Sequence, residues 1–532
     1  MDNVWLRIAA SIVCSVIFCV ATVQSVGAMQ QSGYKGGMFM RWLKRKDNLF
    51  FNRLWVWALC LALASTLTAL CFSFLGTTGA LALSSAPFFL LCGLFMLADK
   101  KYALKVPVKR TPRFQRLFVV YFFFVAVVCY VWIALLTFLS KWNGSQIYAL
   151  IAYAPFSATP MVLPLLLCLA NAVTGIFENA RNKKFVKRAG QVLNETDILR
   201  VAVVGSYGKT SVKNILKTLL SVKYDVAATA ASYNTPMGIA LTVTAPDFAK
   251  KQVLIAEMGA RKAGDIKELC ALVKPQFAAF TGVCAQHIET FGSIENVWAE
   301  KSEILRSGAT VVCSEALRAL AQKDGLDTQA TFVGNSCVKD VDLQATKTKF
   351  TLCLGDNEIA VETDLLGDSA VENIALAATL AYKMGLTAED IEKGLQTLAP
   401  VEHRLQLLQS GGVYILDDGY NCNERGAKAA IDALCRFTGR KCIVTPGIVE
   451  CGVLEEQTNA HLGAEIAKAN LDLVILVGET LVTSVKNGYV SGGGNAEKLR
   501  TVKTLALAQE TLKGWLCAGD AVLFLNDLPD VY

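Results

Sequence analysis

The chain has 532 residues, of which 53% are hydrophobic and only 18% are charged, against about 25% charged residues in an average soluble domain. This composition excludes an intrinsically disordered protein and a nucleic-acid-binding tail, and it argues against a wholly soluble protein. Residues 1–200 hold 21 basic and 6 acidic residues, a balance of +15, whereas the rest of the chain has a balance of −8. The seventeen cysteines are scattered without a CxxC pair, so neither a disulfide framework nor a structural zinc site is expected.

Residues 1–178 are predicted to form an α-helical membrane domain. A span needs about 20 mostly apolar residues, and five stretches qualify: 8–27, 54–75, 79–98, 117–140 and 147–177. The first also resembles a signal peptide, but only Arg7 provides a basic residue before it and four further spans follow, so a retained helix is preferred. Three prolines interrupt the last stretch, which is compatible with one kinked helix or with a hairpin; an odd number of spans fits the charge pattern.

The connecting segments alternate in charge, which predicts the orientation of the spans. Loops 28–53 and 99–116 are strongly basic, whereas the turn at 76–78 is uncharged and the turn at 141–146 has a single lysine. By the positive-inside rule, the basic loops face the cytoplasm, together with a basic linker at 179–198 and everything after it. Binding of phosphate or lipid headgroups is a second interpretation of the same charge. We therefore expect a multi-pass protein of the cell membrane with cytoplasmic C-terminal domains.

A glycine loop follows the linker in the setting of a phosphate-binding loop, or P-loop. Residues 200–204 predict a short buried strand, residues 212–222 predict a helix, and between them lie Gly205, Ser206, Tyr207, Gly208, Lys209, Thr210 and Ser211. Backbone N–H groups and a helix N-terminus cradle phosphates in such loops, while the lysine contacts the β- and γ-phosphates and the threonine hydroxyl ligates Mg²⁺. An ordinary glycine turn before a helix is the simpler alternative.

Strands and helices continue to alternate after this loop. Strands are predicted at 252–256 and 277–281, and helices at 296–306 and 370–384. This alternation is typical of an α/β fold with a parallel sheet, in which ligands bind at the carboxyl ends of the strands.

The motifs resemble those of the Mur ligases and come in the same order. They are the glycine loop, Ser232–Gly238, Glu257–Ala260, His287–Glu289, Lys301–Ile304, His403–Leu405 and Asp417–Asn423. Within that family the MurF type, which adds D-alanyl-D-alanine to a muramoyl peptide, is the most similar. The resemblance covers about residues 199–532 and implies a central P-loop Mur ligase domain at 199–400 and a Rossmann-like C-terminal domain at 401–532. Strand patterns at 413–416, 442–445 and 473–477 support the second sheet.

The resemblance also implies a chemistry: ATP converts a carboxylate to an acyl phosphate, which an amine attacks to form an amide. Two Mg²⁺ ions and fixed cations would offset the charge. By similarity, the catalytic residues are Lys209, Glu257, His287 and Lys301. The metal ligands implied are Thr210, Glu257, His287 and a carbamylated Lys301. ATP would be bound by the glycine loop together with Asn373, Arg404 and Asp418, and the substrate would be contacted by Asn234, Thr235, Tyr420, Asn421 and Asn423.

Three features depart from the family pattern. The predicted spans stand where relatives carry a soluble domain that binds the UDP of the acceptor. Relatives usually have a His-Asn pair before the adenine-side asparagine, and the segment before Asn373 has neither residue. In the third departure, Glu424 replaces the proline of the usual Asn-Ala-Asn-Pro.

The function we expect is amide-bond formation in cell-wall peptide synthesis at the membrane. The substrates would be a muramoyl peptide, in a soluble or a lipid-linked form, and an amino acid or dipeptide. Membrane lipid would be a further partner, and no nucleic-acid partner is expected. A polyglutamate-type synthetase of the same superfamily is one alternative. A non-catalytic membrane scaffold or ATP sensor that retains the ligase fold is the other.

Overall fold

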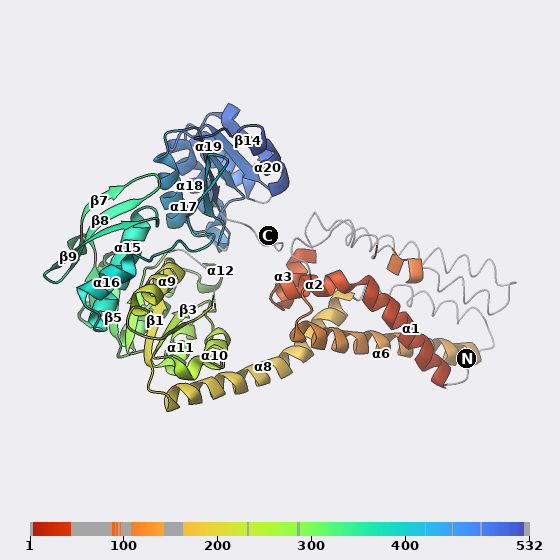
Figure 1. The fold of residues 1–532 in the computed structure, drawn as a ribbon. Helices are drawn as coiled ribbons and strands as arrows, with labels where there is room; N and C mark the ends of the chain where they lie inside the picture. Colours follow the sequence, from red (N-terminus) through yellow and green to blue (C-terminus); the bar gives the residue numbers. More distant parts are fainter. Residues whose placement is uncertain are drawn as a thin grey trace. The chain divides into compact units, whose positions relative to one another are not determined.

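The computed structural model describes residues 4–43, 88–90, 92–93, 96, 108–142, 163–230, 233–284, 288–420, 422–449, 451–478 and 481–525 (Figure 1). The chain divides near residue 182 into an N-terminal unit and a second unit that continues to residue 528.

All the regular secondary structure described in the N-terminal unit is α-helical. Its helices are α1 (Val4–Ala21), α2 (Val23–Gln31), α3 (Gly36–Leu43), α6 (Pro112–Trp142) and the first part of α8 (Leu163–Glu195). The predicted span at 8–27 is interrupted at Thr22, whose hydroxyl donates to the Phe18 carbonyl at 2.8 Å and lies 3.0 Å from the Tyr121 hydroxyl. Such back-bonding by a threonine bends a helix, so two helices replace the single predicted one.

Among the described residues, Val4–Ala21 and Pro112–Leu135 are long and apolar enough to cross a membrane, judged by length and composition. The predicted span 117–140 lies within α6. The predicted span 54–75, most of 79–98 and residues 147–162 lie outside the described residues. The number of five spans therefore stays a prediction.

Helix α8 extends through most of the predicted basic linker. It remains helical to Glu195, and Ala189 and Leu193 are buried in the core of the second unit. The basic side chains of this stretch, by contrast, are exposed: Arg181, Lys183, Lys184, Lys187 and Arg188.

The second unit begins with a six-stranded sheet in the order β2-β3-β1-β4-β5-β6, in which every pair of neighbours is parallel. The strands are β1 (Leu199–Val204), β2 (Val226–Ala228), β3 (Val253–Met258), β4 (Phe277–Phe280), β5 (Thr310–Ser314) and β6 (Ala330–Val333). The predicted strands at 200–204, 252–256 and 277–281 are confirmed, each shifted by a residue or so. Their apolar runs follow from burial of both faces of a parallel sheet.

Helices cover both faces of this sheet. Alternate strand residues point to opposite sides, so Val201 and Val203 pack on one face while Ala202 and Val204 pack on the other. The first face carries α9 (Lys209–Leu220), α15 (Asp368–Lys383) and α16 (Ala388–Leu395). The second carries α10 (Pro236–Val243), α11 (Asp265–Val273), α12 (Ile288–Phe291), α13 (Ile294–Lys301) and the end of α8, with α14 (Arg318–Lys323) at its edge.

Two further sheets complete the unit. An antiparallel sheet of β7 (Val338–Leu343), β8 (Thr348–Leu354) and β9 (Asn357–Thr363) packs on the α15 side. The last sheet has the order β10-β11-β15-β12-β13-β14, with only β10 antiparallel to its neighbour. Its strands are β10 (Gln406–Ser410), β11 (Val413–Asp418), β12 (Lys441–Thr445), β13 (Leu473–Val477), β14 (Leu499–Val502) and β15 (Ala521–Leu525).

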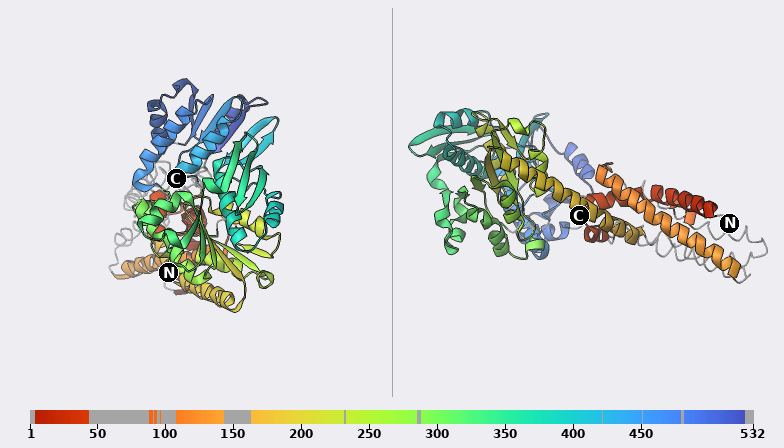
Figure 2. Two further views of the ribbon diagram at one scale, coloured as in Figure 1. Left: turned by 90° about the vertical axis from the view of Figure 1, so that its left-hand side faces the viewer. Right: turned by 90° about the horizontal axis from the view of Figure 1, so that it is seen from below.

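Helices also cover both faces of the C-terminal sheet. The helices α17 (Glu424–Cys435), α18 (Glu455–Lys468) and α19 (Val482–Ser491) pack on one face, and α20 (Leu505–Lys513) packs on the other. In Figure 2 (left) this C-terminal layer, in blue, lies above the yellow-green central sheet. The carboxyl ends of β1, β3 and β11 bring the predicted site segments together.

Candidate active site

The glycine loop at 205–208 joins the end of β1 to the start of α9, and its conformation requires glycine at two positions. Gly205 has a φ of 153° and Gly208 a φ of 72°. A Cβ atom at Gly205 would lie 2.0 Å from Thr281 Oγ1, and one at Gly208 would lie 2.7 Å from Asn373 Oδ1. The loop is thus packed against Thr281, which follows β4, and against Asn373 of α15, with no room for a side chain at Gly205 or Gly208. The N-terminus of α9, with its unpaired N–H groups and positive dipole, is directed into the same space.

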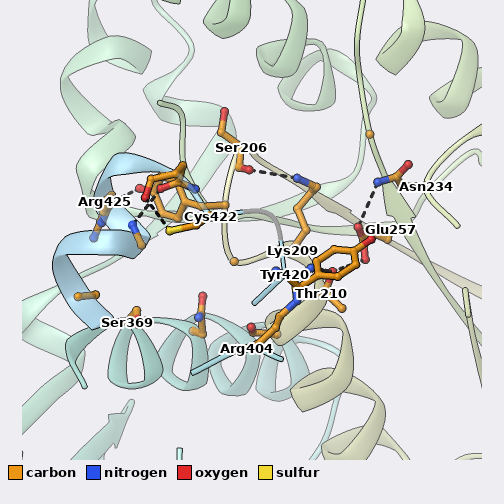
Figure 3. A pocket seen from close by; sticks show the side chains of 18 of the residues that line it. Ser206, Lys209, Thr210, Asn234, Glu257, Ser369, Arg404, Tyr420, Cys422 and Arg425 are labelled. Atoms are coloured by element: carbon orange, nitrogen blue, oxygen red, sulfur yellow. Dashed lines mark hydrogen bonds between the residues drawn. The ribbon is translucent and has the colours of Figure 1, made fainter. Parts of the chain in front are cut away.

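Lys209 folds back over this loop. Its Nζ donates to the Gly205 carbonyl at 2.8 Å and to the Ser206 carbonyl at 3.3 Å (Figure 3). Burial lowers the pKa of Lys209, while the Glu257 carboxylate acts in the opposite direction and the Arg404 charge adds to the lowering. Ser206 Oγ is buried and has no hydrogen-bond partner within the described parts of the chain. The loop therefore offers donors that a bound oxyanion can satisfy.

The Glu257 carboxylate lies at the end of β3, only 1% exposed, and accepts three side-chain hydrogen bonds. Its Oε2 accepts from Thr210 Oγ1 and from Lys213 Nζ, each at 3.0 Å, and its Oε1 accepts from Asn234 Nδ2 at 3.3 Å (Figure 3). Thr210 and Lys213 both come from the first turns of α9. This fixes an oxygen pair, Thr210 and Glu257, beside the glycine loop.

Lys301 also contacts the glycine loop. It ends α13, is 2% exposed, and its Nζ donates to the Gly205 carbonyl at 3.0 Å. Burial, and then the charge of Lys209, lower the pKa of Lys301 to about 7. The preceding Glu300 accepts from the backbone N–H groups of Gly264 and Ile266 at 2.7 and 2.6 Å, which ties α13 to the start of α11. The position of Lys301 is therefore fixed by α13, and its ammonium group loses a proton more readily than that of a solvated lysine.

The C-terminal part of the unit contributes Arg404. Its Nη2 donates to Thr210 Oγ1 at 3.2 Å, and its guanidinium lies 4.7 Å from the centre of the Tyr420 ring. The two residues beside it, His403 and Leu405, have φ values of 59° and 46°. Left-handed backbone at two non-glycine residues costs free energy, which surrounding contacts must offset. The strained turn aims Arg404 at the glycine loop.

Asp418, at the end of β11, accepts a hydrogen bond from the Leu405 N–H at 3.0 Å. Burial raises the pKa of Asp418 to about 6, although that hydrogen bond and the Arg404 charge act in the opposite direction. The carboxylate is thus desolvated beside the strained turn and is available to a ligand hydroxyl group.

A further contact joins the central and C-terminal parts of the unit and was not predicted from the sequence. It is a cluster of Arg425, Tyr207 and Glu372. Arg425 donates to both carboxylate oxygens of Glu372 at 2.6 Å and to the Tyr207 hydroxyl, and its guanidinium lies 4.6 Å from the centre of the Tyr207 ring. The available signal was electrostatic: Arg425 lies in the first turn of α17, where a cation is unfavourable unless it has a partner.

A cavity of about 550 Å³ unites these groups, and most of the predicted site residues line it. They are Ser206, Tyr207, Gly208, Lys209, Thr210, Ser211, Asn234, Thr235, Glu257, Lys301, Asn373, Arg404, Asp418, Tyr420 and Asn423. Gly205 shapes the loop from beneath and is not a lining residue. The predicted residues His287 and Asn421 lie outside the described residues.

The departures from the family pattern have different surroundings. Ser369 lines the cavity beside Asn373. Glu424 does not belong to the lining, and its Oε1 lies 3.0 Å from His461 Nδ1. The extra carboxylate is therefore directed at a histidine of α18.

The comparisons with known proteins agree with this geometry. Residues 203–381 match the Mur ligase middle domain. The UDP-N-acetylmuramoyl-tripeptide–D-alanyl-D-alanine ligase of Escherichia coli is 28% identical over 309 residues, 56% of this chain and 68% of that protein. Its Bacillus subtilis counterpart is 30% identical over 297 residues, 54% of this chain and 64% of that protein. The chain thus spans about two thirds of the length of these relatives.

Solved structures show the same fold. MurF of Thermotoga maritima in complex with ADP has a TM-score of 0.59 and 25% identity, covering 66% of this chain and 81% of that one. MurF of Acinetobacter baumannii has a TM-score of 0.60 and 22% identity, covering 66% and 78%. Residues 203–381 thus carry a Mur ligase middle domain, and the chain is similar in sequence and fold to the MurF-type Mur ligases.

Proposed function

We propose that this chain is a membrane-attached, ATP-dependent amide ligase of peptidoglycan synthesis. It would join a D-alanyl-D-alanine-type amine to the carboxylate of a muramoyl peptide through an acyl phosphate. The observation that carries the proposal is the convergence of Lys209, Lys301 and Arg404 on one glycine loop beside the Thr210–Glu257 pair. A triphosphate and a carboxylate repel each other, and this concentration of fixed cations offsets that repulsion.

The residues of the loop fit ATP with Mg²⁺. The buried Ser206 hydroxyl and the start of α9 suit phosphate oxygens. Thr210 and Glu257 supply the hydroxyl and carboxylate oxygens that Mg²⁺ prefers, and Mg²⁺ usually completes its shell with phosphate and water. Among the described residues, no group of three or more His, Cys, Asp or Glu side chains could hold a metal ion. Bound by Thr210 and Glu257, Mg²⁺ would neutralise charge on the transferring phosphoryl group.

The other nucleotide contacts follow from the same geometry. Lys209 would exchange its carbonyl partners for phosphate oxygens, and Arg404 would reach the γ-phosphate from the opposite side of Thr210. Asp418 is placed to accept from a ribose hydroxyl, and Asn373, whose Oδ1 lies against Gly208, is proposed by resemblance to lie near the adenine. Closure of the C-terminal domain over the loop would exclude water, which protects an acyl phosphate from hydrolysis.

Carbamylation is the proposed state of Lys301. Its lowered pKa of about 7 leaves much of the amine neutral at physiological pH. The Nζ lone pair can then form an N–C bond to CO₂ with loss of a proton to solvent. The resulting carbamate is an anion that suits a site beside a divalent cation, whereas an ammonium would repel it. His287 is proposed as a second metal ligand by resemblance.

The acceptor and amine would occupy the part of the cavity lined by Asn234, Thr235, Tyr420 and Asn423. Amide and hydroxyl side chains can orient a carboxylate and an amine without adding net charge. Asn421 is proposed here by resemblance alone.

Membrane attachment would place the reaction at the inner leaflet. Apolar side chains such as Trp5, Val13, Val119 and Phe123 are more than half exposed on α1 and α6, as lipid-facing residues would be. By the positive-inside rule, the basic loops would place the ligase domains in the cytoplasm, where ATP is present. A lipid-linked muramoyl peptide is the sharper form of the proposal, because confinement to one surface raises the effective concentration of acceptor.

Product mass spectrometry tests the proposal. Full-length protein receives ATP, Mg²⁺, soluble or lipid-linked muramoyl tripeptide, and a pool containing D-alanyl-D-alanine and L-glutamate. We expect the acceptor to gain D-alanyl-D-alanine with release of phosphate, and Lys209→Ala to abolish the gain while the exposed-lysine control Lys217→Ala retains it. A glutamate product would identify a polyglutamate-type synthetase, and no product with any donor would favour the scaffold. Equal turnover on the soluble acceptor would remove the lipid-linked form.

A further inference from the structure

Lys213 forms a buried ion pair with Glu257 that the family motifs did not predict. The side chains of both residues are 2% exposed, and Lys213 Nζ lies 3.0 Å from Glu257 Oε2. Lys213 follows Thr210 by three residues on α9, so both side chains reach the same carboxylate oxygen from one face of the helix. An ammonium group therefore lies beside the oxygen pair to which Mg²⁺ is assigned above.

This arrangement has an electrostatic consequence. The Glu257 carboxylate is already neutralised, because Lys213 supplies a full positive charge and Thr210 and Asn234 supply hydrogen bonds. A free divalent cation entering the site would bind to a carboxylate that is already paired with Lys213. It would also be repelled by the Lys213 ammonium, because the buried surroundings screen charge poorly. A complex of the metal with a triphosphate carries a net negative charge, so its attraction to Lys213 offsets the repulsion between Lys213 and the metal.

We propose that Lys213 is a positioning residue that makes metal binding conditional on nucleotide. It holds the Glu257 carboxylate oriented toward Thr210 while the site lacks metal, and it disfavours free Mg²⁺ so that the metal enters as its nucleotide complex. This inference rests on the proposed roles of Thr210 and Glu257 in metal binding. It adds a residue and an order of binding that the motif resemblance does not contain.

Equilibrium dialysis of Mn²⁺ against full-length protein in detergent tests the inference without requiring turnover. Mn²⁺ substitutes for Mg²⁺, and the dialysis is run with and without a non-hydrolysable ATP analogue in both chambers. For the unaltered protein we expect at least one bound Mn²⁺ with the analogue and at least tenfold weaker binding without it. For Lys213→Met we expect binding without the analogue to tighten at least tenfold, because the buried carboxylate has lost its cation.

Two variants serve as controls. Lys217→Met removes an exposed lysine one turn further along α9 and should behave as the unaltered protein. The double variant Lys213→Met/Glu257→Gln should lose the gained binding, which would assign it to Glu257. Circular dichroism and the melting temperature establish that each variant is folded.

The outcomes separate this inference from the proposed function. If the unaltered protein binds Mn²⁺ equally well with and without the analogue, the inference is wrong while the ligase proposal stands; this result requires no variant. A folded Lys213→Met protein without nucleotide-free binding also overturns it. If the unaltered protein binds no Mn²⁺ even with the analogue, the assignment of metal to Thr210 and Glu257 fails as well.

Discussion

Arg404 Nη2 donates a hydrogen bond to Thr210 Oγ1 over 3.2 Å, although the two residues belong to domains built on different sheets. Thr210 is in turn hydrogen-bonded to Glu257 at the end of β3. One hydroxyl group thus connects the C-terminal domain, the glycine loop and the central sheet. A movement that separated the two sheets would break this hydrogen bond.

Replacement of Arg404 should therefore affect catalysis more than folding. We expect Arg404→Ala to lower kcat by about 100-fold or more, the usual effect of removing one group that stabilises transition-state charge. Arg404→Lys should recover part of the loss, because it keeps the charge without the planar fork. Phosphate release is the measurement, and Arg500→Ala, which removes an exposed arginine of the same domain, is the matched control. A kcat unchanged in Arg404→Ala would remove this residue from the phosphate site.

The cluster of Arg425, Tyr207 and Glu372 should couple the domains measurably. In a double-mutant cycle of Arg425→Ala and Glu372→Ala, we expect an interaction free energy of about 0.5–1 kcal/mol, small because both side chains are partly exposed. Nucleotide affinity measured by calorimetry is the readout. Tyr207→Phe, which retains the ring beneath the guanidinium, should have a smaller effect than Tyr207→Ala. Strictly additive single effects would show that the contact carries no coupling.

Lys301 predicts a dependence on CO₂ that changes with pH. CO₂ adds only to the neutral amine, and with a pKa of about 7 the neutral fraction falls as pH falls through 7. Protein stripped of CO₂ should regain activity about tenfold more slowly at pH 6 than at pH 8 when dissolved CO₂ is held constant. Lys301→Ala should show no such recovery at either pH. Recovery that is independent of pH, or of CO₂, would contradict carbamylation.

The predicted topology can be checked in intact cells. A fluorescent protein that matures only in the cytoplasm should fluoresce when fused after residue 532, and a tag before residue 1 should be accessible from outside. Both results follow from an odd number of spans with basic loops inside. A C-terminal fusion that is dark but exported would place the ligase domains away from ATP and overturn the proposed function.

The sequence pattern predicted the parts of the fold that depend on local signals. Strands β1 and β3 were recognisable because a parallel strand buried on both faces reads as a continuous apolar run. Strand β7 was missed because most of its side chains are exposed and charged or polar. Lys213 was missed for a different reason: a lysine on a helix is usually solvated, and only the fold brings this one to Glu257. The partner of Arg425 lies 53 residues away, so local spacing could not predict it.

Asp418 should reveal a conflict between stability and function. Burial raises the pKa of Asp418 from 3.8 to about 6, so above pH 6 the charged carboxylate destabilises the folded protein. This destabilisation disappears below pH 3.8, where the carboxyl group is protonated in both the folded and the unfolded protein. At pH 7.5 we expect Asp418→Asn to raise the free energy of unfolding by about 1–2 kcal/mol, because the amide keeps the hydrogen bond from Leu405 without the buried charge. The same change should weaken nucleotide binding about tenfold, since a charged acceptor for the ribose hydroxyl is lost. Denaturant unfolding at pH 7.5 and pH 5 measures the first effect, which should shrink at the lower pH. Asp356→Asn, which alters an exposed aspartate of the turn between β8 and β9, is the control. A destabilised Asp418→Asn protein would show that the carboxylate supports the strained turn at Arg404 instead of opposing folding.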